Sequence, residues 1–255
     1  MKIRWLAIWA LTWWNTALPA TPAPMELTIY ADAYPPFIQH EGGQLNGPYI
    51  EAFTQLAAKQ GIRVHYQPMP IKRVMKLIAT QQNSCGLAVY FAPGEAETLS
   101  YVARVAPITL AVYARQGEVG KLYNIEALRN YRVGAMDVSE LNELLDNAAI
   151  HYEPLAKTAK GIAMLQAGRF ELLVTDVLPE LVLSSQTGPK IERVMILARV
   201  ERWLACHPQL PVTELNALRQ AMHDGVFADS VANIWQHYGL RPVYDEVRRE
   251  WGNPH

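Results

Sequence analysis

The sequence predicts an α/β protein that is built from two similar units in series. Strand-like runs alternate with segments whose apolar residues recur at helical spacing, which is typical of α/β folds. The runs at 85–91 and 172–175 are almost continuously apolar, as expected of strands that are buried in a parallel sheet. A polar connector at 115–120 separates the two series. We therefore expect a β-α-β-type sheet, flanked by helices, on each side of this connector.

The first unit begins and ends with a strand. Two consecutive prolines, Pro35 and Pro36, end its first strand. Ile50 and Phe53 share one face of a helix that Gly61 ends. In chain order, we expect a strand at 27–30, a helix at 49–60, a strand at 62–66, a helix at 73–79, and strands at 85–91 and 108–114.

The second unit repeats this plan with shorter elements, and two more helices follow it. We expect strands at 132–135, 151–155, 172–175, 194–198 and 203–206. We expect helices at 125–128, 138–147, 158–166, 178–184, 213–223 and 227–238. The charged cluster of Arg248, Arg249 and Glu250 near the end indicates a solvated terminal face.

Residues 1–20 have the pattern of a secretory signal peptide. Lys2 and Arg4 precede an apolar stretch at 5–14, and small and turn-forming residues follow up to Ala20. The apolar stretch is shorter than the roughly 20 residues that span a bilayer. We expect cleavage near Ala20 and a periplasmic protein, with an uncleaved anchor at the membrane surface as the alternative.

Charge and motif content argue against several classes of function. The net charge is −1, so there is no electrostatic reason to expect a nucleic-acid partner. The histidines lack metal-ligand spacing, and no hydrolase, Walker or Cys-x-x-Cys motif occurs. We expect no metal and no cofactor. The two cysteines, Cys85 and Cys206, leave a disulfide and a pair of buried free thiols as alternatives.

Six short segments, taken in order, resemble one protein family. They are the Tyr-Pro-Pro-Phe sequence at 34–37, the glycine-then-helix segment at 47–53, and the segments at 107–113, 132–140, 168–176 and 215–225. Each is weak alone, and their order and spacing together are more specific. From about residue 26 to about residue 240, the chain is similar to type II periplasmic binding proteins. Within these it resembles the family-3 extracellular solute-binding proteins, best known for polar amino acid transport.

The resemblance implies two lobes, each an α/β sheet, joined by two crossing strands, with the solute in the groove between them. It divides the mature chain into a discontinuous first lobe, 25–111 plus 203–255, and a second lobe, 112–202. It implies a monomer that closes around a small polar solute, either amino-acid-like or an amine or organic acid. The expected partner is an ABC permease or a membrane sensor.

One position departs from the family pattern. Amino acid binders of the family carry a Thr-Pro-Glu-Arg-like motif whose Arg grips the ligand carboxylate through two hydrogen bonds. Counting nine residues back from Pro107 places Thr98 at the position of this Arg. A threonine donates one neutral hydrogen bond and supplies no charge. The usual mode of binding an α-amino acid is therefore disfavoured.

The predicted ligand-binding residues are Tyr34, Arg73, Tyr90, Phe91, Thr98, Ser139 and Asp176. Asp176 ends an apolar strand where family members bind an ammonium group, with a helix cap as the alternative role. The rings of Tyr90 and Phe91 could stack on a flat or cationic solute or pack in the core. Arg73 could replace the missing charge. Ser139 could donate to an anion from a helix start.

The resemblance also bears on the two cysteines. Cys85 opens a first-lobe strand, and Cys206 ends the strand that returns from the second lobe. The two could therefore lie side by side near the hinge, and we expect a disulfide that fixes the base of the first lobe.

Two other functions stay open beside solute binding. Some proteins that resemble this family use the same cleft for dehydration or cell-wall cleavage, and the carboxylates of Glu51, Glu97 and Asp176 could serve acid–base chemistry. An orphan sensory protein without a ligand is the other alternative. Of the three, we expect a binding protein and not an enzyme.

Overall fold

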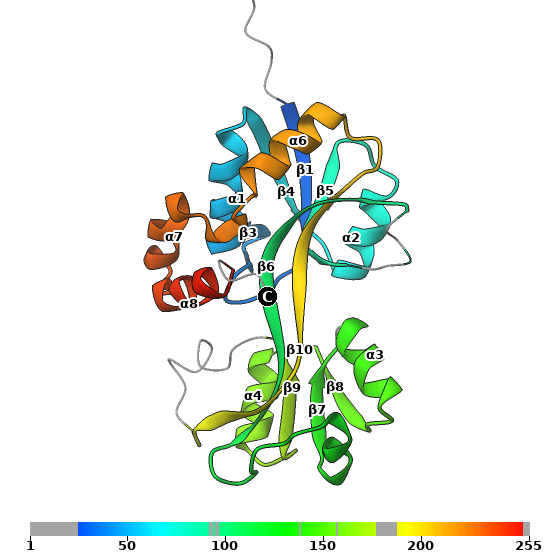
Figure 1. Cartoon of the computed structure of the whole chain (residues 1–255), viewed down its shortest axis with the longest axis vertical. Helices are drawn as coiled ribbons and strands as arrows, with labels where there is room; N and C mark the ends of the chain where they lie inside the picture. Colours follow the sequence, from blue (N-terminus) through cyan, green and yellow to red (C-terminus); the bar gives the residue numbers. More distant parts are fainter. Residues whose placement is uncertain are drawn as a thin grey trace, which may run out of the picture.

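The computed structural model describes residues 25–91, 94, 97–137, 139–156, 158–176 and 188–251. The predicted signal peptide at 1–20 and the predicted helix at 178–184 lie outside the described residues. The described chain forms two lobes, stacked along the long axis of the molecule (Figure 1). Two long strands, β6 (Ser100–Arg115) and β10 (Ile191–Cys206), run through both lobes and join them. No helix in this part of the chain is long and apolar enough to cross a bilayer.

One sheet continues through both lobes in the order β4-β1-β5-β10-β6-β9-β7-β8. Its other strands are β1 (Met25–Ala31), β4 (Ile62–Pro68), β5 (Ser84–Tyr90), β7 (Val133–Met136), β8 (Tyr152–Leu155) and β9 (Leu172–Thr175). β1 is parallel to β4 and β5, and β7 is parallel to β8 and β9. β10 is antiparallel to β5 and β6, and β6 is antiparallel to β9.

The register brings the carboxyl ends of the parallel strands to the crossing strands. Tyr90, the last residue of β5, pairs with Arg202, which in turn pairs with Ala106 of β6. Thr175, the last residue of β9, pairs with Ala111 of β6. The strand ends of the two lobes therefore approach the same short stretch of β6 from opposite directions. This is where α/β folds place ligands.

Helices cover both faces of the sheet in the first lobe. α2 (Ile71–Ile78) packs Val74 and Ile78 against one face. The other face carries the larger core, in which buried residues of four helices contribute. These are α1 (Pro48–Ala58), α6 (Val212–Ala221), α7 (Ala232–His237) and α8 (Arg241–Trp251). A small hairpin, β2 (Gln39–Glu41) and β3 (Gln44–Asn46), lies between β1 and α1 in sequence.

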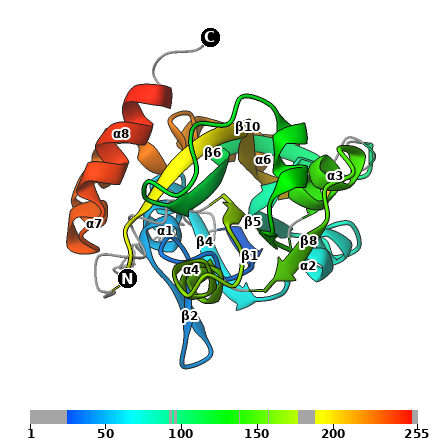
Figure 2. The same ribbon diagram turned by 90° about the horizontal axis from the view of Figure 1, so that it is seen from below.

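The second lobe repeats the same layering on a smaller scale. One core lies under the 3₁₀ helix η2 (Ile125–Asn130) and α3 (Ser139–Asn147), and includes Leu128 and Leu141. A separate core lies under α4 (Thr158–Gln166) and includes Phe170. Seen along the long axis in Figure 2, α7 and α8 lie together on one side of the molecule, and α2 and α3 lie on the other.

The prediction of two separate strands at 194–198 and 203–206 is wrong. β10 is one continuous strand of 16 residues, because its pairing with β6 continues across the gap between the lobes, with several register shifts. Each lobe is therefore connected to the other by strands whose hydrogen-bonding groups are already satisfied. Such a ribbon can bend without exposing unpaired backbone.

The end of the chain also differs from the prediction. The helix expected at 227–238 is broken into 3₁₀ turns at Gly225–Phe227 and Asp229–Val231, followed by α7. An added Cβ at Gly225 would clash with the carbonyl oxygen of Val105, so the backbone here packs directly on β6. α8 was not expected at all. It packs Val243 and Tyr244 in the core, and its Arg248 pairs with Asp224 and Asp229 at 3.4 and 3.6 Å. Arg249 is exposed, so the charged side of this helix is solvated as expected.

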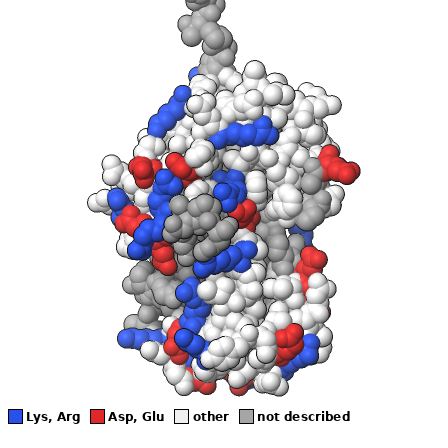
Figure 3. Space-filling model, in the orientation of Figure 1, with Lys and Arg blue, Asp and Glu red and all other residues white. Residues whose placement is uncertain are grey.

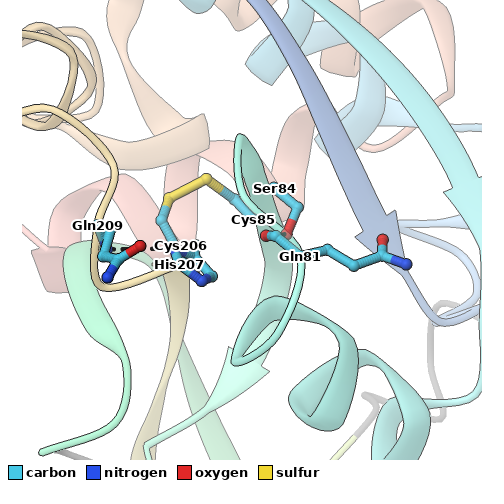
Figure 4. The surroundings of a disulfide bond; sticks show 6 residues. All are labelled: Gln81, Ser84, Cys85, Cys206, His207 and Gln209. Atoms are coloured by element: carbon cyan, nitrogen blue, oxygen red, sulfur yellow. Dashed lines mark hydrogen bonds between the residues drawn. A yellow bond between two sulfur atoms is a disulfide. The ribbon is translucent and has the colours of Figure 1, made fainter.

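The predicted disulfide between Cys85 and Cys206 is confirmed, and its expected place near the hinge is wrong. The two residues lie directly opposite each other where β5 begins and β10 ends (Figure 4). Beside them, the amide of His207 donates to the carbonyl of Ser84 at 2.9 Å. The crossing point lies at the other end of this ladder, because Tyr90 and Arg202 pair there. The bridge therefore closes the base of the first lobe, far from the gap.

The surface in view carries charges of both signs. Figure 3 shows Lys and Arg side chains interspersed with Asp and Glu side chains on this face. Among the described residues, no group of three or more His, Cys, Asp or Glu could hold a metal ion. The charged groups that stand apart from this pattern are buried, and they lie between the lobes.

Candidate functional site

A buried arginine lies where the two lobes meet. Arg202 belongs to β10, and only 5% of its surface is exposed. It stands in the ladder between Tyr90 of β5 and Ala106 of β6, on the first-lobe side of the gap. Charged side chains are almost never fully buried unless they are paired. The groups around this guanidinium therefore define the site.

Asp176, directly after β9, pairs with Arg202 from the opposite lobe. Nη2 of Arg202 donates to Oδ2 of Asp176 at 2.7 Å, and the two side chains are only 6% and 4% exposed. Nη2 also donates to the hydroxyl of Tyr90 at 2.6 Å, and Nη1 donates to the carbonyl of Ala88 at 3.2 Å. The ion pair is thus both buried and shared between the lobes.

Two tyrosine rings flank the guanidinium of Arg202. Its central carbon lies 3.7 Å from the ring centroid of Tyr90 and 4.6 Å from that of Tyr34. The Tyr34 hydroxyl donates to the backbone carbonyl of Asp176 at 3.4 Å, which is a second contact between the lobes. The aromatic rings stabilise the cation through their π electrons.

The surroundings keep the guanidinium charged and the nearby tyrosines protonated. Burial alone would lower the pKa of Arg202, but Tyr90 and Asp176 raise it above its usual value. Burial, together with the charge of Asp176, raises the pKa of Tyr34 well above the normal range for tyrosine. Burial likewise raises the pKa of Tyr49. At neutral pH these tyrosines therefore keep their protons and can act as hydrogen-bond donors.

One nitrogen of the guanidinium has no hydrogen-bond partner in the part of the chain that the structure describes. The Nε atom of Arg202 is buried and has no hydrogen-bond partner among the described residues. A buried donor without a partner loses its hydration with nothing in exchange. It is the only nitrogen of this guanidinium without a described partner, and an acceptor supplied from outside the chain would satisfy it.

An open pocket adjoins the ion pair on the side of α8. Its volume is about 60 Å³, and it is open to solvent at its mouth. Asp176 and Tyr34 belong to its lining, as do Pro107 and Thr109 of the crossing strand β6. The pocket therefore reaches Asp176, the second-lobe member of the ion pair, and borders both lobes.

The structure brings together three of the predicted ligand-binding residues. Tyr34, Tyr90 and Asp176 all contact Arg202. Arg73 does not join them: it is exposed on α2, so the charge at the centre of the site comes from another residue. Whether any of these residues contacts a solute stays a prediction.

The other predicted residues lie apart from the ion pair or outside the described side chains. Phe91 is 45% exposed and packs its ring on Tyr101 and Trp203, with centroids 4.8 and 6.0 Å apart. Thr98 is exposed. Ser139 begins α3, and its side chain is outside the part of the chain that the structure describes. Their roles also stay predictions.

Arg202 is the residue that the sequence analysis missed. The predicted strand began one residue later, at Trp203, and Arg202 was left in the connection before it. A signal was present, because a cation directly preceded an apolar run that returns from the second lobe. The distance in sequence to Asp176 gave no indication that the two side chains would meet.

The three carboxylates considered for acid–base chemistry have separate surroundings. Asp176 is held by Arg202. Glu51 accepts a hydrogen bond from the Tyr238 hydroxyl on the first lobe. Glu97 is exposed. In the described part of the chain, therefore, each has its own environment and no shared site.

The sequence matches no protein-family model and no curated protein. Its fold, however, is similar to many solved structures. An ancestral arginine-binding protein bound to arginine is 16% identical, with a TM-score of 0.64 over 91% of this chain and 100% of that chain. A histidine kinase sensor domain with similarity to periplasmic binding proteins is 16% identical, with a TM-score of 0.67 over 90% of this chain and 96% of that one.

A third structure, the GluR0 ligand-binding core in complex with L-glutamate, is 13% identical, with a TM-score of 0.70 over 84% of this chain and 98% of that chain. At this level of identity the likeness concerns the fold. The chain has the two-lobed fold of the periplasmic binding proteins, as the sequence predicted. These structural neighbours are binding proteins and a sensor domain rather than enzymes.

Proposed function

We propose that this chain is a solute-binding protein that closes on a small polar guest at the Arg202–Asp176 pair. The observation that carries the proposal is the pair itself, a buried cation and a buried anion supplied by opposite lobes. Removing both charges from water is costly, so such pairs are weak devices for stability and are concentrated at functional sites. Structural neighbours with this fold bind arginine or glutamate.

The chemistry of the pair suits a guest with two kinds of polar group. An anionic oxygen can accept from Nε of Arg202, the donor without a partner. An ammonium or amide group can donate to Asp176. A guest that offers both replaces the contact between the two side chains and leaves neither charge unpaired. A guest with only one of these groups pays the cost of an isolated buried charge.

Arg202 also supplies the cation that the family pattern would place at Thr98. We propose that the chain grips an anionic group from the crossing strand β10 rather than from the loop that follows β5. Tyr34 and Tyr90 then flank the guanidinium, and Asp176 closes over it from the second lobe. Arg73, Phe91, Thr98 and Ser139 are proposed as further contacts around the guest.

The same proposal extends to where the protein works. With residues 1–20 as a signal peptide, the mature chain is periplasmic and delivers its guest to an ABC permease or a membrane sensor. The sequence predicted a lobe boundary after residue 202, but Arg202 pairs with Tyr90 of β5, so we propose a first lobe of 25–111 and 202–255 and a second lobe of 112–201. Closure is then a hinge motion along β6 and β10, and it draws Asp176 toward Arg202.

A matched pair of variants tests the proposal. The purified mature protein is screened by thermal shift against amino acids, amines, organic acids and sugars, and hits are measured by calorimetry. Arg202→Gln should weaken binding of a hit at least about tenfold. Arg199→Gln, at an exposed arginine of the same strand, should leave the affinity within about twofold.

The screen also separates the alternatives. A bound guest raises the melting temperature by mass action. An enzyme would consume its hit, which mass spectrometry of the recovered mixture detects. An orphan sensory protein would show no hit in any class. Equal binding by the wild type and Arg202→Gln would remove Arg202 from the site and with it this proposal.

A further inference from the structure

We infer that the guest is net neutral and carries an apolar group, and that this group occupies the pocket between β6, α8 and Asp176. This inference rests on the proposed function, because it extends the same site. The pocket begins at Asp176, where the polar part of the guest ends, and opens on the side of α8. Figure 2 shows that α7 and α8 lie on this side of the molecule, opposite α2 and α3.

The inner wall of the pocket is apolar and tightly packed. Phe37, Tyr49 and Phe227 line it, and they are only 7%, 2% and 1% exposed. The rings of Phe37 and Tyr49 stack with centroids 5.1 Å apart, and the edge of Phe227 approaches Tyr49 at 6.2 Å. Trp235 supports all three from behind. A wall of interlocked rings keeps its shape and favours an apolar or aromatic group.

The outer wall comes from the last helix of the chain. Val243 and Val247 of α8 face the pocket, and Ile108 of the crossing strand completes the apolar lining. Arg193, which lies in the second-lobe part of β10, and Asp176 belong to the other lobe. A group that fills this space therefore contacts both lobes at once. Burial of this group would stabilise the closed state in proportion to the apolar area that it removes from water.

The charges that border the pocket cancel. Asp176 is already paired with Arg202 at the inner end. At the rim, Arg193 and Glu246 are both exposed, and neither forms an ion pair with another described residue. One cation and one anion thus remain at the mouth and one of each at the base. Because water solvates Arg193 and Glu246, the buried pair decides. A guest with charge of one sign only would pair with Arg202 or Asp176 and leave the other buried charge without compensation, whereas a zwitterion would pair with both.

Three matched pairs of probes test the inference by calorimetry. Each pair differs by one phenyl group: alanine and phenylalanine, acetate and phenylacetate, ethylamine and phenylethylamine. Phenylalanine should bind at least about tenfold tighter than alanine, because the phenyl group is desolvated in the pocket. It should also bind at least about tenfold tighter than phenylacetate or phenylethylamine, each of which carries a net charge.

Variants of α8 locate the apolar group. Val247→Trp fills the pocket and should weaken phenylalanine binding at least about tenfold while leaving alanine within about twofold. The control is Val212→Trp on α6, at a residue that is 69% exposed and outside the pocket. This variant should change neither the affinity for phenylalanine nor the affinity for alanine. Circular dichroism and thermal melting check that both variants fold. Val247→Ala, which cannot overfill the site, should instead favour the larger ring of tryptophan over phenylalanine.

The outcomes separate this inference from the proposed function. Equal binding within the pairs, or binding that Val247→Trp and Val247→Ala leave unchanged, overturns the apolar pocket while the solute-binding function stands. A guest that binds with high affinity and has a net charge or no apolar group also overturns it. If no probe and no member of the broad solute panel binds, the proposed function itself fails, and the inference fails with it.

Discussion

The ladder between β5 and β10 is joined differently at its two ends. At one end Cys206 lies opposite Cys85, and a disulfide connects them within the first lobe. At the other end Arg202 lies opposite Tyr90 and reaches Asp176 in the second lobe through an ion pair. A solute cannot change the first connection, but its own charges can replace the second. The same two strands therefore carry a covalent bond at one end, which no solute alters, and an ion pair at the other end, which a solute can replace.

Removing one charge of the ion pair should have the largest effect on stability. Arg202→Met leaves Asp176 buried without its cation, and should lower the free energy of unfolding by about 3–5 kcal/mol in urea denaturation. The double variant Arg202→Met, Asp176→Leu should recover most of this loss, because an apolar pair has no charge to desolvate. If the double variant were as unstable as the single one, packing rather than charge would be the cause.

Removing the disulfide should have a somewhat smaller effect and should leave the gap intact. The bond joins residues 121 positions apart, so its loss frees a long loop in the unfolded chain. Cys85→Ala with Cys206→Ala should lower the free energy of unfolding by about 2–4 kcal/mol. Guest affinity should stay within about twofold, because the bridge lies at the far end of the ladder from Arg202. A large loss of affinity would contradict the separation of the two ends.

Tyrosine titration should show a smaller effect that is confined to alkaline pH. Burial raises the pKa of Tyr238 to about 12, and a hydrogen bond to Glu51 contributes. The folded pKa then exceeds the unfolded value of about 10, so this stabilisation is complete below pH 10 and is lost as the pH rises toward 12. Absorbance of tyrosinate at pH 11 should be lower for the native protein than for the denatured chain. Tyr238→Phe should remove part of that difference, and an identical native titration would contradict the assignment.

The smallest effect should come from the exposed ion pair between Glu201, the neighbour of Arg202 on β10, and Arg104 of β6. Arg104 and Glu201 are 2.7 Å apart, and their side chains are 50% and 37% exposed. Glu201→Gln should change the free energy of unfolding by less than about 1 kcal/mol, because solvent screens the pair. Urea denaturation at low and high salt measures this change. If Glu201→Gln lowered the free energy of unfolding as much as Arg202→Met, the difference in burial between the two ion pairs would not explain their contributions to stability.

Local sequence patterns predicted most of the elements. The apolar runs at 85–91 and 172–175 became β5 and β9, and the helical spacing after Gly47 became α1. Tyr34, Tyr90 and Asp176 were predicted as site residues because each follows or ends a strand, where side chains of α/β folds face a ligand, and because the family resemblance marks Tyr34 and Asp176. The structure brings all three to Arg202. α8 was missed because its apolar positions are few and its charges on the surface resemble those of a solvated tail.

Strand periodicity and turn residues are properties of neighbouring positions, so the α/β class and the order of the elements were accessible from the sequence alone. The meeting of Arg202 with Asp176, and the place of the disulfide at the base rather than the hinge, were decided by the tertiary structure. Both depend on the register of β10 against its neighbours, and the former also on how the two lobes approach each other. A pattern of apolar residues specifies which face of a strand is buried, but not which distant side chain lies opposite it.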